Sequence, residues 1–155
     1  MKLKNIKIAT ILPYKENYTH SKASAASLWV SEFFKKSRFR NNNYIFGSTL
    51  DNDYLGKNYI NIELKNIKSK FKSTTSEYLK KLIKKIDKKS FDIIEVHNRP
   101  LILEYLLNNI KSRFIFYFHN DPLSMNGSKS EKQRLNIIKN SEKIIFVSKW
   151  VQNRF

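Results

Sequence analysis

The chain has 155 residues, of which 30 are Lys or Arg and 13 are Asp or Glu, so its formal net charge is +17. This length suffices for one domain with a buried core and is too short for two full enzyme domains. The absence of Cys excludes disulfides, thiolate zinc sites and cysteine nucleophiles. A hydrophobic fraction of 41% excludes a disordered basic tail, because such tails lack the apolar surface that offsets chain entropy. We therefore expect a single globular domain over residues 1–155.

The apolar pattern alternates between short β-branched runs and segments with helical spacing. Strands are predicted at residues 6–12, 44–47, 59–62, 91–97, 113–119 and 143–147. Helices are predicted to begin at Ser21, Ser76, Pro100, Ser130 and Ser148. In the first helix, Leu28, Trp29 and Phe33 form the expected apolar side. Strands alternating with helices predict an α/β fold, a Rossmann-like doubly wound parallel sheet with helices on both faces.

In such a sheet, ligands bind at the carboxyl ends of the strands, and polar residues are predicted there. They lie at residues 14–20 after the first strand, including Tyr14 and Glu16, and at residues 97–99 after the fourth, including His97 and Arg99. His119, Asn120 and Asp121 follow the fifth strand, and Ser148 and Lys149 follow the sixth. An imidazole at this edge can donate or accept a hydrogen bond near neutral pH, which suits a sugar hydroxyl or a phosphate oxygen. A loop histidine whose bonds are satisfied within the protein is the alternative. We expect these strand ends to meet at one cleft.

The first strand-to-helix turn lacks both glycine-rich patterns that bind dinucleotides or nucleotide phosphates. Mostly small residues stand there instead, namely Lys22, Ala23, Ser24 and Ala25. Small side chains at a helix N-terminus let a phosphate or sugar hydroxyl approach the free N–H groups and the positive end of the helix dipole. Close packing of the helix against the sheet is the alternative explanation for this composition.

Neither a metal site nor a serine nucleophile is predicted. The segment that begins at Asp51 resembles the start of a calcium loop, but Leu55 and Ile62 occupy positions that need oxygen ligands. It is therefore read as a surface turn. The three His are far apart in the sequence, without H-E-x-x-H spacing, and there is no G-x-S-x-G motif.

Three segments carry a family resemblance: residues 92–100, 116–122 and 143–148. They resemble successive core strands in the N-terminal domain of GT-B glycosyltransferases, most closely the large retaining, nucleotide-sugar-dependent family called glycosyltransferase family 4. The resemblance spans almost the whole chain. It implies one Rossmann-like, acceptor-side half of a two-domain fold, with the donor-binding C-terminal domain absent from this chain. That family is usually rich in Gly at the first turn, whereas residues 22–26 contain none.

The resemblance implies transfer of a sugar, with retention, from a nucleotide-sugar to a glycan or lipid-linked acceptor, as in cell-envelope polysaccharide synthesis. His119 would be the catalytic residue beside the donor sugar, and Lys22, Ala23, Ser24 and Ala25 would face the donor phosphate. The implied acceptor-binding residues are Tyr14, Glu16, His97, Arg99, Asn120 and Asp121. Such enzymes are similar in needing no metal or other cofactor. The expected partners are the two substrates and the C-terminal domain of the same protein, and the 155 residues alone are expected to fold without being active.

The positive charge is concentrated locally. Residues 65–89 contain ten Lys and two acidic residues, which accounts for +8 of the +17. The candidate patch on the predicted helix consists of Lys80, Lys81, Lys84, Lys85 and Lys88. Such a patch favours contact with an anionic membrane or an acidic acceptor, and a Lys-rich composition that merely solvates a helix face is the alternative. Because no signal peptide or membrane span is evident, we expect a cytoplasmic protein, either soluble or attached peripherally to the inner face of the membrane.

Two other function classes remain open. A basic α/β module could bind nucleic acid with strongly salt-dependent affinity, although the sequence contains no DNA- or RNA-reading motif. A stand-alone small-ligand domain of the flavodoxin type is the other alternative.

Overall fold

The computed structural model describes residues 5–14, 16–64, 74–87 and 89–155. The strands are β1 (Ile8–Ile11), β2 (Asn43–Gly47), β3 (Tyr59–Asn61), β4 (Ile93–His97), β5 (Arg113–Phe118) and β6 (Lys143–Phe146). The helices are α1 (Ala25–Lys36), α2 (Thr74–Asp87), α3 (Pro100–Leu107), the 3₁₀ turn η1 (Pro122–Ser124), α4 (Glu131–Asn140) and α5 (Lys149–Asn153). Most of the Lys-rich crossover and Lys88 lie outside the described residues.

All the strands pair in parallel, in the order β3-β2-β1-β4-β5-β6. The predicted Rossmann-like parallel sheet is therefore confirmed. This is the order of dinucleotide-binding Rossmann folds rather than the flavodoxin order. The order reverses between β1 and β4, and in open α/β sheets ligands bind outside the carboxyl ends of the strands at such a switch point.

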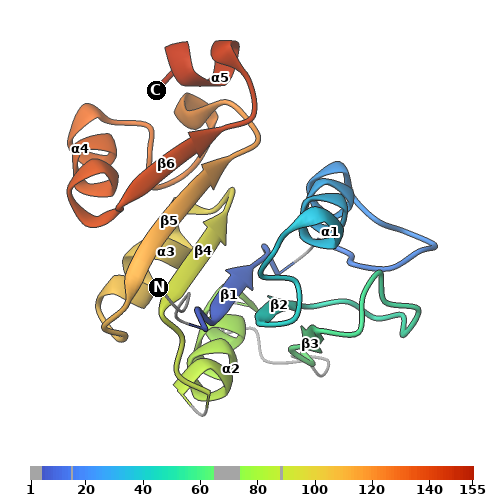
Figure 1. Ribbon diagram of the computed structural model, residues 1–155. Coiled ribbons are helices and arrows are strands. Elements are labelled where there is room, and N and C mark those ends of the chain that lie inside the picture. The colour runs from blue at the N-terminus through green and yellow to red at the C-terminus, as the bar shows by residue number, and fades with distance from the viewer. Residues whose placement is uncertain (1–4, 15, 65–73, 88) are drawn as a thin grey trace.

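The two faces of the sheet are covered unequally (Figure 1). On one face, apolar residues of α2 and α3 and Ile137 of α4 pack with Ile94, Val96 and Phe116 in the main core. On the other face lies α1, whose Val30 and Phe34 pack with a smaller cluster that includes strand residues of β2 and β3. In the described part of the chain, no helix covers this second face over β5 and β6.

Several local predictions are confirmed. In α2, Tyr78, Leu79, Leu82 and Ile86 are buried, as their spacing predicts, and the Tyr78 hydroxyl donates a hydrogen bond to the Leu12 carbonyl oxygen at 2.8 Å. The predicted caps also form. Ser130 makes a capping box with Gln133, and Ser148 accepts a hydrogen bond from the backbone N–H of Val151.

The predicted start of α1 at Ser21 is wrong. The helix begins at Ala25, and Ser24 is its N-cap, accepting a hydrogen bond from the Ser27 N–H. The cause is a contact from another part of the chain. The backbone N–H of Ser21 donates to the Asp53 carboxylate at 2.9 Å, which holds this segment against the loop before β3.

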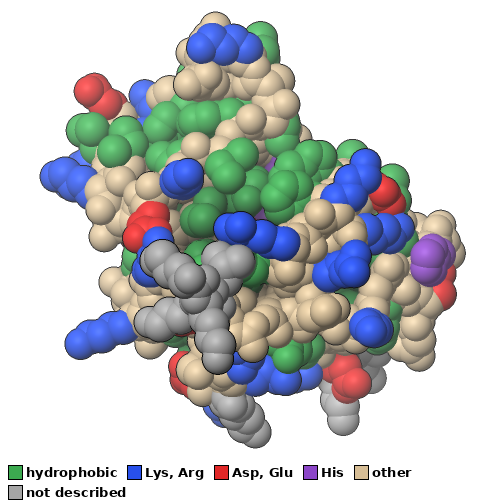
Figure 2. All heavy atoms as spheres, in the orientation of Figure 1, with side chains coloured by type: hydrophobic (Ala, Val, Ile, Leu, Met, Phe, Trp, Pro, Cys, Tyr) green, Lys and Arg blue, Asp and Glu red, His purple; other side chains and the backbone are tan. Residues whose placement is uncertain are grey.

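The predicted packing side of α1 is also wrong. Its buried residues are Ala26, Ser27, Val30, Ser31 and Phe34, whereas Leu28 is 49% exposed and Phe33 46% exposed. Small residues let the helix approach the sheet closely, so residue size selects the packing side here. Exposed hydrophobic side chains therefore remain on α1, and Figure 2 shows such side chains gathered between α1 and the β5–β6 half of the sheet.

Candidate functional site

Two of the predicted site residues are in direct contact. His97 ends β4 and His119 follows the neighbouring strand β5, so their side chains lie on the α1-facing side of the same sheet edge. Nδ1 of His97 and Nε2 of His119 lie 2.8 Å apart. The His97 ring stacks on Tyr117 with centroids 4.3 Å apart. The rings of His119 and Trp29 of α1 are nearly perpendicular, with centroids 5.4 Å apart.

Burial keeps both imidazoles neutral. His97 is 1% exposed, and its burial, together with the neighbouring His119, lowers its pKa well below the ordinary value. Burial also lowers the pKa of the half-buried His119 to about 4. At neutral pH, His119 can therefore donate or accept a hydrogen bond to a ligand, but it carries no charge and holds no ionisable proton for transfer as an acid.

A buried polar network lies beside this pair on the same face of the sheet. The Glu95 carboxylate accepts hydrogen bonds from the Thr10 hydroxyl at 2.8 Å and the Tyr117 hydroxyl at 3.2 Å. Thr10 Oγ1 also lies 3.2 Å from the side-chain oxygen, Oδ1, of Asn43. Burial raises the pKa of Glu95, and the two hydroxyl donors oppose that effect. The sequence analysis missed this network, although an acidic residue in the middle of an apolar strand is a signal that could have revealed it.

Asn98 connects the two strand ends. It adopts a left-handed backbone conformation with φ of 56°, which Asn tolerates better than most residues. Its Oδ1 accepts hydrogen bonds from the backbone N–H groups of His119 and Asn120, each at 3.3 Å. Its own N–H donates to the Tyr117 carbonyl oxygen at 2.8 Å. Asn98, which lies in the predicted polar segment 97–99, therefore sets how the loop after β5 leaves the sheet.

A cavity of about 550 Å³ lies on the other side of the same edge. Its walls include Tyr14 after β1, Arg99 before α3, and Asn120, Met125 and Lys129 after β5. Three predicted site residues therefore meet here, at the switch point between β1 and β4. Among the described residues, two cationic side chains and no carboxylate line this cavity, which favours an anionic ligand.

The structure thus divides the predicted residues into two groups. Tyr14, Arg99 and Asn120 line the cavity, whereas His97 and His119 lie beneath Trp29 and do not line it. Asn98 bonds to the backbone of His119 and Asn120, and so joins the two groups. Glu16 shares the loop of Tyr14 but does not line this cavity.

Other predicted residues make contacts within the protein. The Asp121 carboxylate caps η1 and pairs with Arg154 at 3.0 Å, and this pairing lowers its pKa. Lys22 pairs with Asp51 at 2.9 Å. Ser24 caps α1 and thereby satisfies one of the N–H groups predicted to face a phosphate. The segment from Lys22 to Ala25 does not line the 550 Å³ cavity.

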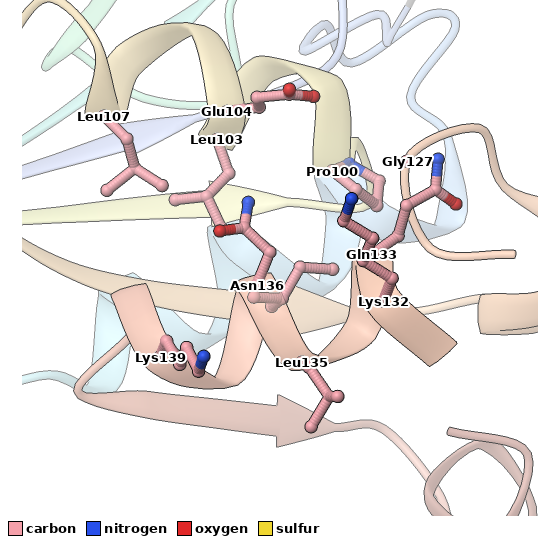
Figure 3. A pocket seen from close by; sticks show the side chains of 11 residues that line it. Pro100, Leu103, Glu104, Leu107, Gly127, Lys132, Gln133, Leu135, Asn136 and Lys139 are labelled. Carbon is pink, nitrogen blue, oxygen red and sulfur yellow. The ribbon is translucent and has the colours of Figure 1, made fainter. Parts of the chain in front are cut away.

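Two further cavities lie nearby. One of about 740 Å³ shares Tyr14 and extends over the ends of β2 and β3, where Asn61 and Thr49 exchange side chain–backbone hydrogen bonds at 3.0 Å. The other, of about 370 Å³, separates α3 from α4, where Leu103 and Asn136 point toward one another (Figure 3). The histidine pair lines neither cavity.

Within the described ranges, no group of three or more His, Cys, Asp or Glu side chains is arranged to hold a metal ion. The helices of these ranges include none with the length and hydropathy of a membrane span. No protein-family model matches the chain, and no curated protein matches it by sequence. The geometry of the strand ends is therefore the basis for assigning a function.

Proposed function

We propose that this chain is the acceptor-side domain of a glycosyltransferase that transfers a sugar, with retention, from a nucleotide-sugar donor to a glycan or lipid-linked acceptor. The observation that carries the proposal is the link between two strand ends beside the switch point of the sheet: Asn98, after β4, accepts hydrogen bonds from the backbone N–H groups of His119 and Asn120, after β5. The strand-end sequences that resemble GT-B glycosyltransferases contain these same three residues.

The chemistry of the site fits sugar recognition. His119 is neutral and half-buried, and the Trp29 ring lies nearly perpendicular to it, so His119 presents an uncharged hydrogen-bonding group next to an aromatic side chain. Arg99 and Lys129 supply positive charge on the other side of the edge, where a phosphate of either substrate would be stabilised. The residues that hold the nucleotide would belong to the second domain, and no metal is required in this mechanism.

The test is turnover by the protein encoded by the whole gene, measured as sugar released or transferred from a panel of nucleotide-sugars. His119→Ala is expected to lower kcat by about 100-fold or more, because it removes a polar group beside the reacting sugar. The matched control is His20→Ala, since His20 is exposed and its backbone N–H bonds the loop before β3. The proposal fails if no nucleotide-sugar is consumed, or if the two variants retain equal activity.

We also propose that α2 carries a surface that binds an anionic membrane peripherally. Lys81 and Lys85 donate to backbone carbonyl oxygens of Glu63 and Asn61, whereas Lys80 and Lys84 are exposed and make no ion pair among the described residues. Two of the predicted patch residues are therefore oriented by the protein, and two are left for a partner. Each Lys near an anionic bilayer contributes about 1 kcal/mol to binding.

Liposome sedimentation tests this surface. The wild type is expected to bind vesicles that contain phosphatidylserine and not vesicles of phosphatidylcholine alone, and Lys80→Glu with Lys84→Glu should abolish the difference. Arg38→Glu with Arg40→Glu is the matched control, because it makes the same charge change beyond the end of α1. Equal binding of the wild type to both kinds of vesicle would remove the proposal.

A further inference from the structure

The contact between His97 and His119 allows two placements of one hydrogen atom. Nδ1 of His97 lies 2.8 Å from Nε2 of His119, and two neutral imidazoles at this distance share one N–H. Either His97 donates from Nδ1, or His119 donates from Nε2. In the first arrangement Nδ1 of His119 carries a hydrogen, and in the second it carries only a lone pair.

The second nitrogen of His97 decides between them. Nε2 of His97 is buried and has no hydrogen-bond partner among the described residues. If His119 were the donor, His97 would carry its hydrogen on this enclosed Nε2, and a buried N–H without an acceptor is rare in folded proteins. If His97 is the donor, Nε2 carries only a lone pair, which is the less costly arrangement.

We infer that His97 is a positioning residue that donates from Nδ1 to Nε2 of His119 and thereby holds His119 as its Nδ1–H tautomer. The ligand would then meet an N–H donor on His119, which suits an oxygen of a hydroxyl, carbonyl or phosphate group. The identity of that ligand rests on the proposed function, whereas the tautomer does not. In the described residues Nδ1 of His119 has no partner, so it remains for the ligand.

The surrounding contacts make His97 suitable for this role. Its ring is held by stacking on Tyr117, at an interplanar angle of 6°, and Trp29 lies 6.1 Å away. The backbone of His119 is held separately by Asn98. The protein therefore orients both the ring and the main chain of His119, and leaves one nitrogen open.

Nitrogen-15 NMR of the histidine rings tests the inference directly on the 155-residue chain. The chain has three His, so few ring signals need assignment. At pH 7.5, the expected spectrum shows Nδ1 of His119 with the shift of a protonated nitrogen and Nε2 with that of an unprotonated one. Histidine in water favours the opposite tautomer, so a His119 with its hydrogen on Nε2 would overturn the inference.

Two substitutions separate positioning from packing. His97→Phe keeps a ring against Tyr117 but removes the donor, and is expected to return His119 to the Nε2–H tautomer. His97→Asn places an amide N–H near the former Nδ1, and is expected to restore the wild-type shifts. His20→Phe is the matched control and should leave His119 unchanged. If His97→Phe leaves the tautomer of His119 unchanged, the inference is wrong, and if that variant does not fold, the wild-type and His97→Asn spectra still decide.

The outcomes for the tautomer and for the proposed function are distinguishable. The ring shifts are measured without a ligand, so they report the hydrogen placement even if the whole-gene protein consumes no nucleotide-sugar. Where that protein is active, His97→Phe is expected to reduce kcat about tenfold, and His97→Asn to recover most of the loss.

Discussion

The α1-facing surface of the sheet has two unlike halves. Over β1 and β2, α1 packs closely through Val30 and Phe34, and Thr10 and Ile45 beneath it are buried. Over β5 and β6, Ile115 and Ile145 are only half-buried, and Val147 beyond β6 is 42% exposed. Figure 2 shows that hydrophobic side chains continue across this boundary.

The histidine pair lies where these two halves meet, and the difference explains its properties. His97 is on the covered side and is fully buried, whereas His119, one strand further along, is half-buried. Trp29 contacts both rings from the edge of α1. The lowered pKa of His119 thus results from burial at the edge of a covered region, which still leaves one ring nitrogen accessible.

The largest expected loss of stability comes from truncating a buried isoleucine, and we compare it with the same substitution on the other face of the sheet. Ile94→Ala is expected to lower the free energy of unfolding by about 3 kcal/mol, because Ile94 is fully buried in the main core. Ile145→Ala, on the uncovered half, should cost about 1 kcal/mol. Urea denaturation measures both. Equal losses would mean that something outside the described residues covers β5 and β6 in solution.

The sequence was sufficient to predict the elements that depend on local pattern. The strands and the α2 stripe follow from residue spacing, and the caps at Ser130 and Ser148 follow from side chains three residues from their partners. The start and packing side of α1 were not predictable in this way. They depend on Asp53, which is distant in the sequence, and on the small residues that let α1 approach the sheet.

The candidate site was predictable only in part. His97 and His119 could be chosen from the sequence because each stands at the end of a predicted strand. The pairing of β4 with β5 then brings them together. The roles of Glu95, Asn98 and Trp29 could not be predicted, because each acts through contacts with another strand or helix. The division of the site across two sides of the sheet edge is likewise a result of packing.

The second prediction concerns two residues other than Gly, Ser90 and Asn98, that have a positive φ in the described ranges and that flank β4. Asn98→Ala is expected to cost about 2 kcal/mol, since it removes an acceptor for two N–H groups and places a Cβ-bearing residue without a local hydrogen bond at φ of 56°. Asn98→Asp keeps the acceptor and should lose less. Ser90 is exposed and has φ of 43°, and Ser90→Gly should change the free energy of unfolding by less than about 0.5 kcal/mol. If Asn98→Ala is as mild as Ser90→Gly in urea denaturation, Asn98 does not hold the site.

The third prediction is that acid weakens the fold through the histidine pair. The pKa values of His97 and His119 are lowered in the folded protein, so below about pH 6.5 the unfolded chain binds protons that the folded chain does not. The free energy of unfolding therefore has its full value above pH 6.5 and falls as the pH approaches 4. The loss is at most about 1.4 kcal/mol per pH unit for each histidine, and it is smaller for His119 because water screens it.

An NMR titration of His119 sharpens this prediction. Trp29→Ala exposes the ring to water and is expected to raise the pKa of His119 from about 4 toward its ordinary value. Leu28→Ala changes the neighbouring, exposed residue of α1 and should leave that pKa in place. If Trp29→Ala has no effect, the cover that α1 provides is not what keeps His119 neutral.

The smallest expected change in stability comes from a substitution of Glu95, and it is a gain, whereas the preceding changes are losses. Burial raises its pKa in the folded protein, so its ionised form destabilises the fold above the raised pKa, and this penalty disappears as the pH falls below the ordinary value. Glu95→Gln keeps an acceptor for Thr10 and removes the buried charge, and is expected to stabilise the protein by about 1 kcal/mol at pH 8. At pH 4 the gain should vanish, whereas the loss caused by the histidines remains.

Thermal unfolding at both pH values separates these contributions. A gain at pH 4 equal to that at pH 8 would show that the pKa of Glu95 is the same in the folded and unfolded chain, and would contradict the rise attributed to its burial.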